Sequence, residues 1–481
     1  MYKIVRNIIV ILISAIVLSS CEDWLDLKPE NDVVRQDFWK SEQQVYSAAM
    51  GLYGLLLDGA NTSRFFNWGE LRGDLLVDVN ASNDFYRILN GDITSDNSVC
   101  DWASIYKSIN QCNIFLKYAK EALKTDVTFT VTELKHYESE AYALRALLYF
   151  YLVRTFNEVP LMLDAVTSDQ VEFFIPKNTS EEIFQQIYND LDSAYRYAVR
   201  DYGIIEHNKG RITKYGVCAI MADVYLWNDD YQKCIDACDT IINSGKYGLV
   251  AGEYWLEDLF INGNSNESLF ELQFSSNKTN PFYSYFKEND GYYMAPYSLL
   301  FLYESKDVRG DTATFYGWGN IYKYSALSSA AVEKRTEGNY EANWIFYRLA
   351  DIFLLKAEAL NELGDGDGAL DLVNRIEKRA KATQILVDPT NKEIVTQLIL
   401  YERKKELAYE GKRWFDVLRN AKRNEYENMD LLINMIQESA PADQVELIKS
   451  KYSDPLSHYL PIYYEEIEVN KLLEQNKYYD N

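Results

Sequence analysis

The sequence predicts a mainly α-helical protein, in which a scaffold of helical hairpins carries long, loop-rich insertions that contain a few short strands. Three observations lead to this prediction. Apolar residues recur every three or four positions over most of the chain. Two segments repeat one hairpin pattern. Two regions, about residues 59–98 and 248–343, lose the helical period and become rich in Tyr, Phe, Gly and Asn.

The beginning of the chain has the pattern of an export signal. Lys3 and Arg6 precede an apolar run over residues 8–18, and two serines stand directly before Cys21. Such a run rises only about 16 Å as a helix, whereas the hydrocarbon core of a membrane is roughly 30 Å thick. We therefore predict a signal peptide over residues 1–20, which directs export and does not span the membrane.

The four residues Leu-Ser-Ser-Cys at 18–21 resemble a bacterial lipobox, in which the cysteine receives a diacylglyceryl group and becomes the first residue after cleavage. We expect lipid attachment at Cys21 and a lipidated tether over residues 21–33. Two or three acyl chains anchor a protein stably where one does not. Glu22 and Asp23 resemble the acidic start of lipoproteins sent to the cell surface. The alternative is an ordinary secretory signal with an incidental cysteine.

Charge and cysteine usage exclude several classes of function. The formal net charge of −24 over 481 residues repels phosphate backbones, so we expect no nucleic-acid partner. Cysteines after Cys21 are odd in number and scattered, which favours buried thiols over a disulfide framework. The three histidines are far apart in sequence, and we expect no cofactor and no obligatory metal. The later cysteines are Cys100, Cys112, Cys218, Cys234 and Cys238.

Two helices begin with a capping-box pattern. Thr130 stands three residues before Glu133, and Thr179 three residues before Glu182, each ahead of an apolar face with helical spacing. Residues 45–57 and 102–123 are further candidate helices.

A more specific pattern occurs twice. Residues 214–247 form an apolar helix with small residues, a break at Asn-Asp-Asp and a second helix, and residues 347–380 repeat this order around a Gly-rich turn. Small residues on both helices allow close approach across a tight turn. The pattern resembles a tetratricopeptide hairpin. An unrelated helical hairpin is the alternative for either copy alone.

The two loop-rich regions are the candidate ligand site. Residues 268–276 alternate as a strand, and the aromatic content argues against disorder. Exposed aromatic rings with a few polar groups suit a carbohydrate or a peptide ligand. For Arg72 and Asp74 a structural ion pair is an equal alternative. The candidate ligand-binding residues are Trp68, Arg72, Asp74, Asn83, Asp84, Tyr86, Tyr283, Tyr285, Tyr292, Tyr316 and Trp318, with Phe85, Phe282, Tyr293, Asn320 and Tyr322 as further members of the same loops.

Residues 402–420, ERKKELAYEGKRWFDVLRN, are rich in charge but do not predict a basic binding patch. We expect the charges to pair along a helix, Glu402 with Lys405, Glu410 with Arg413, and Lys412 with Asp416. Leucine, tryptophan and phenylalanine supply a buried stripe. We therefore assign this segment to the scaffold.

The order of these parts resembles the SusD/RagB family of nutrient-binding outer-membrane lipoproteins of Bacteroidetes. The resemblance rests on the lipobox, WLDLKPE at 24–30, FFNWGELRGDLL at 65–76, the two hairpins, YESKDVRGD at 303–311, the segment 402–420 and LPIYYEEIEVN at 460–470. It implies one SusD-like domain over residues 34–481 at the outer membrane. It also implies delivery of a glycan, or another oligomeric nutrient, to a SusC/RagA-type TonB-dependent transporter.

Two other functions are weighed against this one. A tetratricopeptide scaffold lipoprotein in envelope assembly needs only the helical hairpins. A surface glycoside hydrolase needs two carboxylates roughly 5 to 9.5 Å apart across a scissile bond. The sequence contains no nucleophile elbow, HExxH motif or phosphate loop, so we expect a binding protein and not an enzyme.

Overall fold

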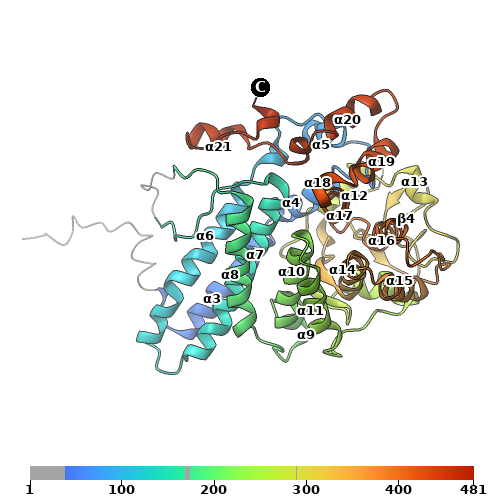
Figure 1. Ribbon diagram of the computed structural model, residues 1–481. Helices are drawn as coiled ribbons and strands as arrows, with labels where there is room; N and C mark the ends of the chain where they lie inside the picture. The colour runs from blue at the N-terminus through green and yellow to red at the C-terminus, as the bar shows by residue number, and fades with distance from the viewer. Residues whose placement is uncertain (1–37, 168–173, 289, 481) are drawn as a thin grey trace, which may run out of the picture.

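The computed structural model describes residues 38–167, 174–288 and 290–480. It is mainly helical, with a few short strands, as the sequence predicts (Figure 1). The predicted signal peptide, the tether and Cys21 lie outside the described residues. Within the described part, no helix is long and apolar enough to cross a membrane.

The N-terminal helices pack around one long central helix. This helix, α7 (Val131–Phe156), contacts α3 (Glu42–Leu56), α6 (Ala103–Tyr118) and α8 (Ser180–Tyr197). Both predicted capping boxes are present, at the starts of α7 and α8. The threonine side chain accepts a hydrogen bond from the N3 backbone amide, while the N3 glutamate accepts one from the threonine backbone, which satisfies two helix-end donors.

One part of the predicted loop region 59–98 is helical instead. Helix α4 (Gly59–Glu70) begins at Asp58, whose side chain accepts a hydrogen bond from the Ala60 amide. Its sequence, GANTSRFFNWGE, contains no regular apolar period because polar Asn and Thr occupy buried positions. The prediction of a loop there was therefore wrong for these twelve residues.

Both predicted hairpins are confirmed. Helices α10 (Lys214–Trp227) and α11 (Tyr231–Ile242) form the first, and α14 (Leu349–Glu362) and α15 (Gly366–Arg379) form the second. The two hairpins are adjacent, because α11 packs against α14 (Figure 1). The Cys234 thiol lies 3.9 Å from the Leu355 carbonyl oxygen across this contact. Small side chains thus allow the close approach. All five cysteines of the described part are free and buried, as expected.

The remaining helices complete the scaffold and its loops. They are α5 (Asn83–Leu89), α9 (Ile205–Gly210), α12 (Phe282–Phe286), α13 (Tyr297–Leu300), α16 (Lys392–Glu406), α17 (Arg413–Ala421), α18 (Arg423–Tyr426), α19 (Met429–Ser439), α20 (Val445–Tyr452) and α21 (Tyr464–Val469).

The strands form four separate antiparallel pairs. These are β1 (Val77–Asp78) with β3 (Tyr293–Met294), β2 (Ser268–Leu272) with β8 (Trp344–Arg348), β4 (Phe315–Tyr316) with β5 (Asn320–Ile321), and β6 (Ala326–Ser328) with β7 (Glu333–Lys334).

The pair β2 and β8 lies in the core. All residues of both strands are buried, and the rings of Phe270 and Phe346 stack with centroids 5.2 Å apart. The predicted strand at residues 268–276 is therefore present in its first five residues. Through this pair, residues 268–272 of the loop region are held against the strand that leads directly into α14.

Candidate functional site

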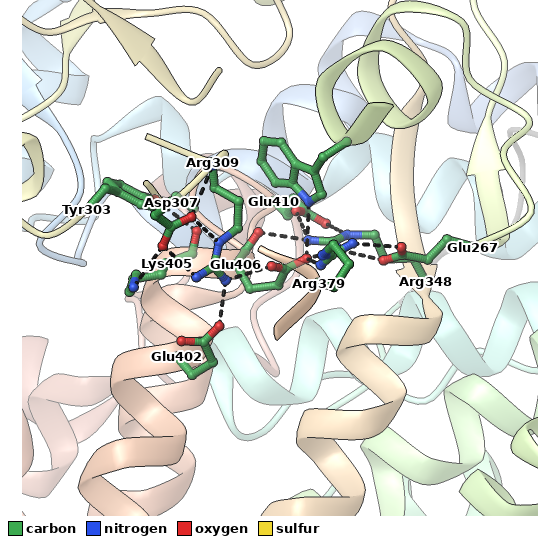
Figure 2. Close-up of polar contacts among 12 residues, drawn as sticks. Glu267, Tyr303, Asp307, Arg309, Arg348, Arg379, Glu402, Lys405, Glu406 and Glu410 are labelled. Atoms are coloured by element: carbon green, nitrogen blue, oxygen red, sulfur yellow. Dashed lines mark hydrogen bonds and ion pairs between the residues drawn. The ribbon is translucent and has the colours of Figure 1, made fainter. Parts of the chain in front are cut away.

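A network of buried charges fixes the loop region to the helices beneath it (Figure 2). Arg309, from the loop region, lies 2.5 Å from Glu402 and 2.8 Å from Glu406, both on α16. Arg348, at the end of β8, lies 2.7 Å from Glu267 and 2.8 Å from Glu410. The side chains of Arg309, Arg348, Glu267 and Glu406 are fully buried. Because these side chains have no surface exposed to solvent, the carboxylates and guanidinium groups must form hydrogen bonds and ion pairs with one another.

The predicted pairing along the helix was wrong. Glu402 pairs with Arg309, and Glu410 pairs with Arg348 and Lys323. Lys412 pairs with Asp351 at 3.1 Å. The charged face of α16 and the turn after it point into the protein, where a partner on another element excludes water better than a neighbour on the same exposed face. Assignment of the segment to the scaffold is consistent with this burial.

The network keeps its charges in the folded protein. Burial alone raises the pKa of Glu406, but Arg379, Arg348 and Arg309 hold the pKa of that carboxyl well below its usual range. Burial lowers the pKa of Arg309, and Glu402, Glu406 and Asp307 raise it well above its usual value. The ion pairs that Arg309, Arg348 and Arg379 make with Glu406 therefore persist near neutral pH, and they hold the loop region in one arrangement.

Backbone pairing brings the two loop regions together. Val77 and Asp78 of β1 pair with Met294 and Tyr293 of β3. The amide of Ala295 then donates to the Gly319 carbonyl at 2.8 Å. These bonds connect α5, the β1–β3 pair, α13 and the β4–β5 hairpin into one continuous unit, which we call the loop surface. Segments more than 200 residues apart in the sequence thus share it.

Trp318 is the most exposed aromatic candidate on the loop surface. It lies at the turn of the β4–β5 hairpin with 81% of its side chain surface exposed. Gly317 and Gly319 flank it with φ of 57° and 107°, values that favour glycine. The turn therefore presents the indole outward between two residues that allow the chain to bend.

Other predicted aromatic residues are partly accessible. Tyr86, on α5, is 44% exposed. Tyr292 is half-buried and lies against Phe85, with ring centroids 6.0 Å apart. Tyr316 and Tyr283 are also half-buried; Tyr283 packs edge-on against Tyr340. These rings can offer part of a face or an edge to a ligand.

Two exposed aromatic residues of the loop surface were missed by the sequence prediction. Tyr297 and Phe301, at the two ends of α13, are 65% and 71% exposed, and their ring centroids are 4.8 Å apart. The segment PYSLLFLYES has the apolar spacing of an amphipathic helix, which predicts that its aromatic residues are buried in the core. The four-residue spacing of these two aromatic residues was the feature of the sequence that could have indicated a pair of contacting rings on one helix face.

Four predicted site residues are buried and are removed from the candidate ligand surface. Trp68 is 1% exposed, and its indole donates to the Val99 carbonyl at 2.8 Å. Tyr285 is 3% exposed, and its hydroxyl accepts from the Asn67 amide. Trp68 lies in the core because α4 is an inner helix and not a loop, and Tyr285, on α12, is buried because it packs against Phe66 of α4. Phe282, Tyr293 and Tyr322, of the same loops, are buried as well.

Arg72 and Asp74 are also buried, but they do not pair with each other. Arg72 donates to the His458 carbonyl at 2.6 Å, and its guanidinium lies 4.2 Å from the centroid of the Trp414 ring. Asp74 pairs with Lys404 and Arg413, each at 2.7 Å. The alternative, an ion pair between Arg72 and Asp74, is therefore wrong, and each side chain binds other residues of the core.

The acidic residues near α5 accept hydrogen bonds that stabilise the adjacent turns. Asp84 accepts hydrogen bonds from the Ser98 hydroxyl at 2.5 Å and the Ser98 amide at 3.1 Å. Asp78 accepts from the Ala81 amide at 2.8 Å. Asn83 is exposed at the start of α5, and Asn320 is half-buried in β5. Within the described ranges, no three His, Cys, Asp or Glu side chains group as metal ligands.

Fold and loop surface together define a class of proteins in which stacked helical hairpins support an aromatic-rich, loop-built surface. A model described as "SusD family" matches residues 224–479, more than half of the chain, and a model described as "Starch-binding associating with outer membrane" matches residues 23–226. The chain belongs to the SusD family. Its general role is therefore that of a glycan-binding protein of nutrient uptake, associated with the outer membrane.

Similar proteins cover nearly the whole chain. "SusD-like protein P38" of Formosa agariphila is 26% identical over 477 residues, which cover 88% of this chain and 92% of that protein. A "SusD-like protein" of Bacteroides ovatus is 26% identical, with 86% and 82% covered.

Solved structures show the same fold. A SusD superfamily protein from Bacteroides thetaiotaomicron superposes with a TM-score of 0.75 at 21% identity, covering 92% of this chain and 99% of that one. "B. fragilis NanU" has a TM-score of 0.73 at 22% identity, with 95% and 100% covered.

Proposed function

We propose that this protein is a lipid-anchored, cell-surface binding protein that captures an oligosaccharide on the loop surface and passes it to a SusC/RagA-type TonB-dependent transporter. In this proposal residues 34–481 act as one SusD-like domain, and Cys21 carries the lipid. The protein binds its ligand and does not catalyse a reaction.

The exposure of Trp318 carries the proposal. An indole that is 81% exposed at a hairpin turn leaves a large apolar face in water, which costs free energy unless something covers it. The C–H face of a sugar ring fits such an indole, while the sugar hydroxyls bind water and nearby polar groups. Tyr297 and Phe301 on α13 offer a second exposed pair of rings in the same unit.

The fixed position of the loops supports affinity. The loop region is joined to the scaffold by the Arg309 and Arg348 ion pairs and by the β2–β8 pair. Rings that are already held in place lose less conformational entropy on binding than rings on a mobile loop. The proposed ligand contacts are Asn83, Tyr86, Tyr283, Tyr292, Tyr297, Phe301, Tyr316 and Trp318.

A binding assay with matched variants tests the function. The mature soluble protein is titrated with neutral oligosaccharides by calorimetry, beside Trp318→Ala. We expect one or more sugars to bind the wild type, and Trp318→Ala to bind them at least about tenfold more weakly. Equal affinity in both proteins would contradict the proposed surface. Sustained release of cleaved product would instead indicate a glycoside hydrolase.

Co-purification tests the partner. The tagged protein is extracted from native membranes in mild detergent. A TonB-dependent barrel should accompany it in a stable complex. Envelope proteins without such a barrel would favour the envelope-assembly scaffold.

A further inference from the structure

Two cavities that share lining residues lie at the end of α7, and none of the aromatic residues of the loop surface lines them. The larger, of about 760 Å³, lies between the end of α7 and the C-terminal segment. The smaller, of about 400 Å³, lies between the end of α7, the start of α8 and the end of α10. Asn157 and Tyr459 line both. The amide of Leu460 donates to the Thr155 carbonyl at 2.8 Å and so holds the C-terminal segment against α7.

Asn157 has a backbone conformation that asparagine rarely adopts. It caps α7 with φ 66° and ψ −57°, and the next amide, of Glu158, turns back to the Phe156 carbonyl at 2.8 Å. Residues other than glycine are strained at this combination of φ and ψ, and strained residues are concentrated at functional sites. Within the described residues, the Asn157 side-chain amide has no hydrogen-bond partner. Its donors and acceptor are therefore available at a residue that lines both cavities.

Tyr459 adds an aromatic wall and a second polar group. The side chain is half-buried, and burial raises the pKa of its phenol to about 12. Its hydroxyl has no hydrogen-bond partner among the residues that the structure describes. Phe156 and Tyr479 line the larger cavity beside it, and Trp227 lines the smaller one.

The lining of the two cavities carries three lysines, Lys177, Lys422 and Lys477, and four acidic side chains, so its net charge is slightly negative. Lys177 pairs with Glu158 at 3.1 Å, and Lys422 donates to the Trp227 carbonyl at 2.9 Å. Glu474 and Asp480 add negative charge to the larger cavity. This arrangement does not favour an anionic ligand, because its charge would compete with neighbouring carboxylates. Aromatic walls with unpaired amide and hydroxyl groups instead suit a neutral ligand that both donates and accepts hydrogen bonds.

We propose that the joined cavities form a second binding site, for a neutral oligosaccharide of two or three sugar units, with Asn157 and Tyr459 at its centre. The larger volume lies within the range of small-ligand sites, and the smaller cavity extends it across α7. The side chains of the first site, including Trp318, do not line either cavity. A second site raises avidity for long chains, because the two sites can hold one polymer together.

The test separates the two sites by mutation. Saturation-transfer NMR with an equimolar mixture of maltotriose, cellotriose, xylotriose and mannotriose is carried out on Trp318→Ala, in which the loop surface is weakened. Dissociation constants of the sugars that bind are then measured by calorimetry. Asn157→Gly removes the amide and suits the positive φ, so it should keep the wild-type melting temperature. Tyr459→Phe keeps the ring and removes only the hydroxyl.

At least one trisaccharide should bind Trp318→Ala, and each cavity substitution added to it should weaken that binding about fivefold to tenfold. The proposal is overturned if none of the four sugars binds Trp318→Ala. It is also overturned if binding is unchanged by both cavity substitutions. Binding of trialanine in place of the sugars, lost on Asn157→Gly, would identify a peptide site and would equally overturn it.

Discussion

Arg309 and Glu406 form an ion pair of 2.8 Å in which neither side chain has any exposed surface. The two residues are 97 positions apart, one in the loop region and the other at the end of α16. Glu402 and Asp307 contact the same guanidinium. The arrangement of the loop region therefore depends on a buried charge.

Arg309→Met should destabilise the protein strongly. The substitution leaves Glu402, Glu406 and Asp307 with fewer cations in a dry environment, and an unpaired buried charge is costly. We expect the free energy of unfolding to fall by about 3 to 5 kcal/mol. Urea denaturation followed by circular dichroism measures this change.

Arg375→Met is the matched control. Arg375 pairs with Asp371 at 2.9 Å on α15, but these side chains are 53% and 63% exposed. Water and ions screen such a pair, so the free energy of unfolding of Arg375→Met should fall by less than about 0.5 kcal/mol. Equal losses in the two variants would show that burial does not give the Arg309 pair its importance.

Glu70 predicts a pH dependence of stability. Burial raises the pKa of its carboxyl to about 8, although the backbone amides of Gly411 and Lys412 lower it. Between the ordinary value of 4.5 and about 8, the folded protein keeps a proton that the unfolded chain has released. The free energy of unfolding should therefore decrease as pH rises through this window, by up to about 1.4 kcal/mol per unit.

Glu70→Gln should remove this dependence, because glutamine does not titrate. The difference in the free energy of unfolding between Glu70→Gln and the wild type should therefore shift in favour of the variant by about 1 to 3 kcal/mol as the pH rises from about 5.5 to about 8. Glu358→Gln is the control. Burial raises the pKa of Glu358, but Arg419 and Arg423 lower it to about 2. The change that Glu358→Gln makes in the free energy of unfolding should therefore be the same throughout this pH range. An equal pH slope in wild type and Glu70→Gln would contradict the assignment.

The sequence predicted the parts of the fold that depend on neighbours in the chain. The capping boxes at Thr130 and Thr179 and the two hairpins were found because each is specified by residues within one short continuous stretch of the chain. The buried charge network was not found, since its partners, such as Arg348 and Glu406, are 58 residues apart. Pairing along the helix was the only interaction that sequence spacing could suggest.

The candidate site illustrates the same limit. Trp68 and Trp318 both stand beside glycine in polar, aromatic-rich segments, NWGE and GWGN. Trp68 is nevertheless 1% exposed on an inner helix, while Trp318 is 81% exposed at a hairpin turn. The difference comes from packing against residues distant in the sequence, so local composition could identify the regions but not which rings face outward.

Substitution of these two tryptophans tests the assignment of the site. Trp318→Ala should weaken oligosaccharide binding by about 1 to 3 kcal/mol and leave the unfolding free energy nearly unchanged. Trp68→Ala leaves a cavity and an unpaired Val99 carbonyl, so it should lower the unfolding free energy by about 3 to 5 kcal/mol. Calorimetric titration and urea denaturation measure the two quantities. Weaker oligosaccharide binding and unchanged stability in Trp68→Ala, with the reverse in Trp318→Ala, would indicate that Trp68 and not Trp318 contacts the ligand.

Replacement of the proposed lipid-bearing residue tests how the protein is held at the membrane. Each buried methylene of an acyl chain contributes about 0.8 kcal/mol, so losing the acyl chains removes most of the attachment. Cys21→Ala should therefore move the protein from the membrane fraction to the soluble fraction in cells that lack the transporter, with unchanged affinity for its ligand. Cys112→Ala, which alters a buried thiol, should remain in the membrane fraction. Retention of Cys21→Ala in the membrane of such cells would show that something other than the lipid provides the anchor.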